Sequence, residues 1–183
     1  MSRGLGDVYK RQLGTTERLR LHFGAVDWSC TVFVNGILVG THAGGFDPFF
    51  FDITDALIEE VEQEIIVSVT DPTDTGNQPV GKQTLNPFAI QYTAVAGIWQ
   101  TVWLEPVPVS CIERSTTVTN IAESSVSVRS HISNASDTMS VIFTCSVNGL
   151  VLTQTESPIK QGQTKTVLTV SYTHLRAHET HLN

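Results

Sequence analysis

Four glutamates within six positions are the most concentrated set of potentially catalytic side chains: Glu59, Glu60, Glu62 and Glu64. Two neighbouring carboxylates can act as general acid and general base when burial raises the pKa of one and its partner stays ionised. This run lies between a short amphipathic turn and a strand, which is typical of a solvated surface. We therefore expect no catalytic carboxylate pair here.

Two groups of residues have the side chains of a metal site but not its setting. His174, His178 and His181 would share one face of a helix, yet they lie at a chain end that resembles non-native sequence, as described below. Asp71, Asp74 and Asn77 lack the alternate-residue spacing and the closing glutamate of a calcium loop, so turn chemistry explains them better. The sequence thus predicts no metal site, and nothing in it indicates a cofactor.

The run at residues 97–105, Gly-Ile-Trp-Gln-Thr-Val-Trp-Leu-Glu, is apolar on both faces of an extended strand. That pattern favours a strand packed between two layers, with Trp99 and Trp103 in the core. Pro106 and Pro108 should end the strand, because neither can donate a ladder hydrogen bond. We expect this run to close a domain.

The rest of the chain has the pattern of short antiparallel strands. Asn35-Gly36 and Asn148-Gly149 each separate two apolar runs, which predicts tight hairpins. One or two helical turns could follow Asp52, with Asp52 or Thr54 as N-cap. Further strands are expected at Leu19–Phe23 (half-exposed), 30–34, 37–40, 64–70, 125–132, 139–147, 150–155 and 164–169. This pattern predicts an all-β fold built from sandwiches.

Composition excludes several classes of protein. The formal net charge of −7 argues against nucleic acid as a partner, and no apolar run is long enough to span a membrane. The chain has an odd number of cysteines and no CxxC motif, so neither a disulfide framework nor a zinc site is indicated. We expect three free, buried thiols, at Cys30, Cys111 and Cys145. Compartment and oligomeric state stay open, and bacterial cytoplasm, periplasm and secretion are all compatible with the sequence.

The two ends of the chain resemble translated sequencing adapter. A DNA sequence that encodes Asp7–Gln12 has a reverse complement that encodes Val170–Leu175, as in reads from metagenomic libraries. We expect residues 1–12 and 170–183 to be non-native and omit them from the fold prediction. Composition changes after Pro108, which predicts one sandwich at 13–108 and a second, immunoglobulin-like sandwich at 109–169. Both sandwiches would be truncated, so the chain is expected to be a fragment.

Several motifs occur in the order seen in glycoside hydrolase family 2. They are Val32-Phe33-Val34-Asn35-Gly36, Val39-Gly40, His42, Gly44-Gly45, Pro48-Phe49, Phe51-Asp52-Ile53-Thr54 and Gly97–Leu104. Residues 18–108 thereby resemble the N-terminal sugar-binding domain of β-galactosidases and β-glucuronidases. The resemblance implies a jelly-roll (galactose-binding-like) sandwich that lacks its opening strands, followed by part of an immunoglobulin-like domain.

The resemblance also implies where the chemistry of the intact enzyme would lie. Family members carry the acid/base on an Asn-Glu pair in a catalytic barrel. This chain contains no Asn followed directly by Glu. The chain should therefore contain no catalytic residue, and a carbohydrate substrate would meet it through the missing barrel. Galactosidases and glucuronidases carry an Asp that contacts the sugar a few residues before their Gly-Ile closing strand. Gln91 stands there in this chain, so Gln91 and Tyr92 are the candidate substrate-binding residues.

Two other classes of protein fit the same strand pattern. The first is a stand-alone carbohydrate-binding module, whose own loops would hold the ligand. The second is a structural β-sandwich repeat without a ligand. A gene that continues into a barrel with an Asn-Glu pair would favour the glycosidase, whereas sugar affinity of residues 13–108 alone would favour the binding module.

Overall fold

The computed structural model of the chain describes residues 14, 16–59, 62–123, 125–136, 138–159 and 165–171. In these ranges the regular structure is β-strand apart from one 3-10 turn, so the all-β prediction is confirmed. The chain divides into two compact units, residues 1–108 and 109–183. No helix among the described residues is long and apolar enough to cross a bilayer.

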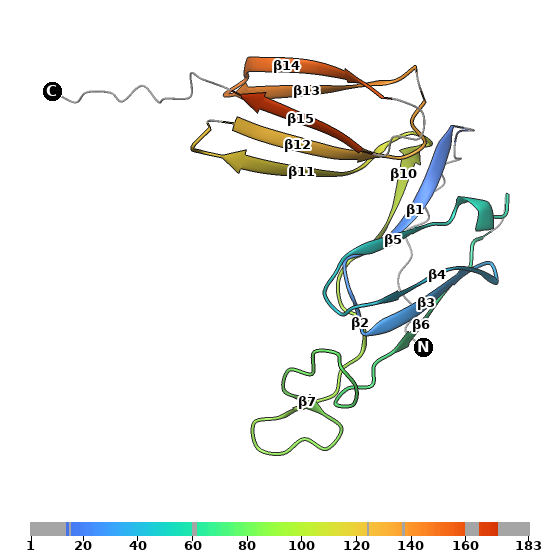
Figure 1. The fold of residues 1–183 in the computed structure, drawn as a ribbon. Helices are drawn as coiled ribbons and strands as arrows, with labels where there is room; N and C mark the ends of the chain where they lie inside the picture. The colour runs from blue at the N-terminus through green and yellow to red at the C-terminus, as the bar shows by residue number, and fades with distance from the viewer. Residues whose placement is uncertain are drawn as a thin grey trace. The chain divides into compact units, whose positions relative to one another are not determined.

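The first unit is a sandwich of two three-stranded antiparallel sheets, seen as separate layers in Figure 1. One sheet has the order β10-β1-β5, and the other has the order β4-β3-β6. The first sheet consists of β1 (Glu17–Phe23), β5 (Phe49–Asp52) and β10 (Val102–Pro108). The second consists of β3 (Ser29–Val34), β4 (Ile37–Ala43) and β6 (Ile65–Thr70).

Alternating apolar residues of both sheets meet in the core of this sandwich. Leu21 and Phe23 of β1 are 2% and 1% exposed, and Val32 and Val34 of β3 are fully buried. The opposite face of β1 is less exposed than the alternation predicts. Arg20 is only 8% exposed because its guanidinium lies over the Phe50 ring, 4.5 Å from the ring centre. Burial of aliphatic and aromatic side chains between the sheets is the main favourable term for folding of this unit.

The predicted Asn35-Gly36 hairpin is confirmed, and its asparagine does more than form the turn. Both turn residues have positive φ, 50° and 79°, as a type I′ turn requires. The Asn35 amide nitrogen donates to the carbonyl of Ala56 (2.8 Å) and to Gln63 Oε1 (2.7 Å). Its amide oxygen accepts a hydrogen bond from the backbone N–H of Glu64 (2.9 Å). One side chain thus joins the hairpin to the segment that leads into β6.

The predicted helical segment after Asp52 is reduced to one short turn. The 3-10 helix spans Thr54–Ala56, and its N-cap position is occupied by Ile53 without a side-chain cap. Neither predicted cap holds that position. The Asp52 carboxylate instead accepts hydrogen bonds from the backbone N–H (3.0 Å) and the hydroxyl (2.7 Å) of Thr54. The turn ends at Ala56 because Leu57 is extended (ψ 146°) and the Ala56 carbonyl accepts a hydrogen bond from the Asn35 side chain.

The prediction for residues 97–105 is wrong in two respects. The run is split into β9 (Gly97–Ile98), which pairs with β2 (Val26–Asp27), and β10, which pairs with β1. It is also exposed: Trp103 is 43% and Leu104 is 47% accessible. The cause is that β10 is an edge strand, with β1 as its one neighbour in the sheet among the described residues.

The two prolines do not stop this strand, contrary to the prediction. β10 continues through Pro106 and Pro108, which lie opposite Leu19 and Glu17 of β1. An edge strand makes ladder hydrogen bonds on one side only, so it can include proline. The position of β10 therefore explains both its prolines and its exposed tryptophan.

Between β6 and β9 the chain forms a long irregular loop with one two-residue pairing. β7 (Gln83–Thr84) and β8 (Tyr92–Thr93) run parallel. The first half of the loop is held by its own polar side chains. Asp71 Oδ1 accepts from the backbone N–H of Thr73 (2.8 Å), and Asp74 Oδ2 accepts from the Thr84 hydroxyl (2.6 Å). Turn and loop bonding thus accounts for both aspartates.

The second unit has one three-stranded sheet, in the order β11-β12-β15, and the hairpin β13-β14. Ile132, Val141 and Ile159 form its small buried core. The Asn148-Gly149 turn has φ of 50° and 81°, so the second predicted hairpin is also confirmed. The strands are β11 (Ile112–Asn120), β12 (Ser125–Ile132), β13 (Ser140–Val147), β14 (Leu150–Pro158) and β15 (Lys165–Ser171).

Two features of this unit were not expected from the sequence. β11 was not predicted as a strand, because its Ser/Thr-rich sequence shows no apolar alternation. The structure shows that it is exposed along its whole length. β15 extends to Val170 and Ser171, which pair with Val126 and Ser125 although they fall in the adapter-like tail. All other residues of the two adapter-like ends lie outside the described ranges.

The cysteines are free, as predicted, but they are not all buried. Cys30 lies in the core of the first unit, whereas Cys111 and Cys145 are half-buried. Burial raises the pKa of the Cys30 thiol. The prediction of three buried thiols is therefore wrong for two of them, because the second unit has a much smaller core.

Asn35→Asp should destabilise the first unit by about 2 kcal/mol, because the carboxylate cannot donate to the two acceptors that the amide bonds. The measurement is chemical unfolding followed by tryptophan fluorescence, which reports the first unit because all three tryptophans lie there, and by far-UV circular dichroism, which reports the strands of both units. Asn148→Asp is the matched control: it makes the same change at the same turn position of an exposed hairpin. Equal losses of stability in both variants would contradict a bracing role for Asn35.

Candidate functional site

A pocket of about 280 Å³ lies at the end of the first unit where β2 pairs with β9. Four segments distant in sequence form its walls: the end of β2, the loop after β4, the start of β7, and the chain through β9. The residues that line it are Asp27, Gly45, Phe46, Gln83, Val95, Ala96, Gly97, Ile98 and Trp99. This pocket combines aromatic, carboxylate and amide side chains, and we call it the Asp27 pocket.

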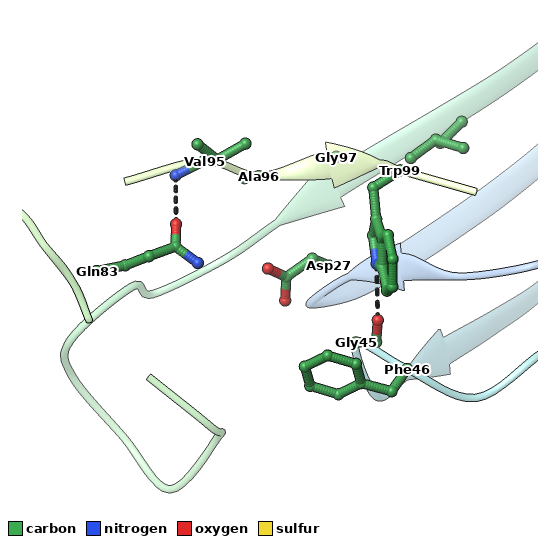
Figure 2. A pocket seen from close by; sticks show the side chains of 9 residues that line it. Asp27, Gly45, Phe46, Gln83, Val95, Ala96, Gly97 and Trp99 are labelled. Carbon is green, nitrogen blue, oxygen red and sulfur yellow. Dashed lines mark hydrogen bonds between the residues drawn. The ribbon is translucent and has the colours of Figure 1, made fainter. Parts of the chain in front are cut away.

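Trp99 and Phe46 form an aromatic corner of the Asp27 pocket (Figure 2). The Trp99 indole N–H donates to the carbonyl of Gly45 (2.8 Å), which fixes the orientation of the ring. The two rings meet edge to face, with centres 5.9 Å apart and planes at 75°. Trp99 is 51% exposed and Phe46 is 67% exposed, so both retain accessible ring surface. The prediction that Trp99 belongs to the core is therefore wrong.

Asp27 provides the one carboxylate among the residues that line the pocket. It is half-buried, and no described residue forms a hydrogen bond to its carboxylate. Burial raises the pKa of Asp27, and the nearby negative charge of Asp71 raises it further. A carboxylate in this state has free acceptor capacity and would be stabilised by a ligand that donates hydrogen bonds.

Gln83 provides an amide on the other side of the pocket. Its Oε1 accepts a hydrogen bond from the backbone N–H of Val95 (2.6 Å), and its Nε2 is the donor atom of the amide. No described residue accepts a hydrogen bond from Nε2. Figure 2 shows the Gln83 amide and the Asp27 carboxylate pointing toward one another. The pocket therefore offers a donor and an acceptor that face the same space.

Glycines allow these segments to approach closely. A Cβ at Gly45 would lie 2.8 Å from Asp27 Oδ1, so a larger residue there would displace the carboxylate or the loop. Gly97 has φ of 127°, a conformation that other residues rarely adopt. The Gly44-Gly45 break and the glycine that opens the 97–105 run were visible in the sequence, and they are the signals that could have indicated a close approach.

The two sequence-predicted substrate residues lie next to this pocket but not in its lining. Tyr92 pairs with Gln83 across β7 and β8, and its ring is 62% exposed. Gln91 Oε1 accepts from the backbone N–H of Phe88 (3.1 Å), and its own N–H donates to the Phe88 carbonyl (3.1 Å). Gln91 thus braces a turn while its amide nitrogen stays unbonded by described residues. Their contact with substrate stays a prediction.

Other residues singled out in the sequence are not brought together. Asp71 and Asp74 bond within their own loop, as described above. No three His, Cys, Asp or Glu side chains converge in the described part of the chain. His174, His178 and His181 lie outside the described residues.

Asp27→Asn should stabilise the protein at neutral pH. The raised pKa means that the folded state binds the Asp27 proton more tightly than the unfolded chain does. Stability from this group is then fully present below the ordinary pKa of 3.8 and is lost as pH rises through the folded-state value. The uncharged Asn avoids that loss, so we expect Tm to rise at neutral pH.

Thermal unfolding across the acid-to-neutral range checks this prediction. The gain should disappear at pH below 3.8, where Asp27 is protonated in both states. Asp47→Asn is the control, because Asp47 is an exposed carboxylate of the neighbouring loop that does not line the pocket. A lower Tm for Asp27→Asn at neutral pH would show that the charge stabilises the fold.

Comparison with known proteins gives relatives among glycosidases. No protein-family model matches the chain. The β-galactosidase of Thermoanaerobacter pseudethanolicus is 32% identical over 103 residues, which are 53% of this chain and 13% of that protein. A protein of Formosa agariphila named "Putative beta-glucuronidase" is 31% identical over 108 residues, 56% of this chain and 12% of its own length. The chain thus spans about an eighth of the length of the curated relatives it matches.

Solved structures give the same result for the fold. A glycosyl hydrolase family 2 member from Bacteroides cellulosilyticus superposes with a TM-score of 0.59 at 18% identity, covering 86% of this chain and 21% of that one. The apo β-glucuronidase 3 of Bacteroides uniformis gives a TM-score of 0.65 at 17% identity, covering 89% and 21%. At these identities the likeness is one of fold. Sequence relatives and structural neighbours together confirm that this chain resembles the β-galactosidase and β-glucuronidase members of glycoside hydrolase family 2.

Proposed function

We propose that this chain is the sugar-binding sandwich, with part of the adjoining sandwich, of a family 2 glycoside hydrolase. The observation that carries the proposal is that two glycosidases exceed 30% identity over about half of the chain. The matched length is too great for a shared short motif, and the all-β fold agrees with it. In the intact enzyme this region would be non-catalytic, and its substrate would be a carbohydrate.

The hydrolysis itself would be performed by residues that this sequence does not contain. A retaining glycosidase uses two carboxylates, one as nucleophile and one as acid and then base, about 5 Å apart. The clustered glutamates near residue 60 do not fit this role, because Glu59, Glu62 and Glu64 are all exposed. The sandwich would instead shape one wall of the sugar pocket.

Gln91 and Tyr92 are the residues that we expect to reach the substrate from this wall. Gln91 directly precedes β8, and Tyr92 is its first residue. The Tyr92 side chain is exposed, and the Gln91 amide nitrogen has no bond to described residues, so both are available to a ligand. An amide at position 91 can bond a sugar hydroxyl but lacks the strong acceptor character of a carboxylate. We therefore expect weaker contact here than in relatives that carry Asp.

A chimeric enzyme tests the proposal. Residues 18–108 would replace the matching segment of the Thermoanaerobacter β-galactosidase, and hydrolysis of a nitrophenyl β-galactoside would be measured. We expect activity in the chimera and none when the segment is deleted, because the sandwich completes the substrate pocket. A folded, soluble chimera without activity would count against the proposal.

Gln91→Asp in the same chimera should lower KM about tenfold, because a charged acceptor makes a stronger hydrogen bond to a sugar hydroxyl than a neutral amide does. Gln100→Asp is the matched control, since it makes the same charge change at an exposed position that does not line the Asp27 pocket. An equal change of KM in both variants would show a general charge effect and would remove Gln91 from the site.

A further inference from the structure

The Asp27 pocket has unused binding capacity that the fold does not require. Asp27 accepts no hydrogen bond from the described residues, and the Gln83 amide nitrogen donates none to them. Both groups face the space that Trp99 and Phe46 border (Figure 2). A half-buried carboxylate without a partner costs stability, so its presence beside two open ring faces points to a ligand.

The volume of the pocket suits one sugar ring. Its 280 Å³ is nearly twice the roughly 150 Å³ of a cavity that holds benzene, which leaves room for a six-membered ring and its hydroxyls. The aromatic corner can contact the apolar C–H face of such a ring, and the indole is held in place by its bond to Gly45. The opening between the segments gives access from solvent, since both aromatic side chains are more than half exposed.

The paired donor and acceptor distinguish a neutral hydroxyl ligand from an organic cation. A carboxylate beside aromatic rings could also hold an ammonium group. An ammonium group, however, has no lone pair to accept from the Gln83 amide, whereas adjacent sugar hydroxyls can donate to Asp27 and accept from Gln83. The amide orientation, fixed by the Val95 N–H, therefore favours a polyhydroxylated ring.

We propose that the Asp27 pocket is a sugar subsite, in which Asp27 and Gln83 bond ring hydroxyls and Trp99 and Phe46 cover the ring. It is separate from the predicted contact at Gln91 and Tyr92. The proposal goes beyond the proposed function, because the pocket binds a sugar whether or not a catalytic domain is present.

Binding is tested by NMR titration of the 183-residue chain with methyl β-galactoside, methyl β-glucoside and methyl β-glucuronide. The reporter is the Trp99 indole N–H signal, assigned with a Trp99→Phe variant. We expect at least one glycoside to shift this signal with a millimolar dissociation constant, which corresponds to about −4 kcal/mol. The Trp103 signal should not move, because Trp103 does not line the pocket.

Variants separate the ligand classes. Asp27→Asn should weaken glycoside binding about tenfold while it raises Tm, a combination that unfolding cannot produce. Gln83→Glu keeps the acceptor for Val95 but removes the donor, so it should weaken the glycoside and strengthen tetramethylammonium. Asp47→Asn should change neither by more than about twofold.

Three results would overturn the subsite. They are no shift of the Trp99 signal with any glycoside, unchanged affinity in Asp27→Asn, and binding of tetramethylammonium in place of the glycosides. The titration is independent of the chimera assay. An inactive chimera with an intact Trp99 shift would reject the proposed function alone, and an active chimera with no shift would reject the subsite alone.

Discussion

The antiparallel pairing of residues 17–27 with 97–108 is the constraint on which the first unit depends. Its register places His22 opposite Trp103 and, further along, Asp27 opposite Gly97. Closing a loop of this length costs conformational entropy before any contact compensates for it. The compensation comes from the core that the intervening strands form against β1, with Phe23 and Val32 almost completely buried. The pocket exists only when this pairing has formed, because it brings Trp99 to Asp27.

The same pairing leaves one side of the sandwich exposed. Leu21 and Leu104 are opposite one another on β1 and β10, yet Leu21 is 2% exposed and Leu104 is 47% exposed. The difference arises because β1 has neighbours on both sides and β10 has one. An apolar edge strand of this kind favours pairing with another β-segment. In the proposed setting, such a segment would belong to the rest of the glycosidase, of which this chain spans about an eighth.

Local signals predicted much of the fold, and nonlocal ones were missed. Asn35-Gly36 and Asn148-Gly149 have the positive φ values that their residue types favour, so both hairpins followed from sequence. The break at residues 99–101 did not, because it arises where the chain changes partner from β2 to β1. The Gly24 N–H donates to the Thr101 carbonyl (2.8 Å) at this point, and a Cβ at Gly24 would lie 2.8 Å from Gln100 Cβ. No pattern within residues 97–105 contains that information.

The candidate site shows the same division between local and nonlocal information. Gln91 was found by its distance from Gly97 in the sequence, whereas Asp27 and Gln83 belong to no motif and meet only in the folded chain. Asp27 differs from its neighbours in sequence because it places a carboxylate next to the apolar core. Its neighbours Val26 and Ala25 are completely buried, whereas the Asp27 carboxylate is half-buried, has no hydrogen-bond partner among the described residues, and has a pKa raised by burial. Carboxylates with a perturbed pKa cluster at functional sites, and in the proposed subsite a hydroxyl-rich ring would supply the donors that Asp27 lacks.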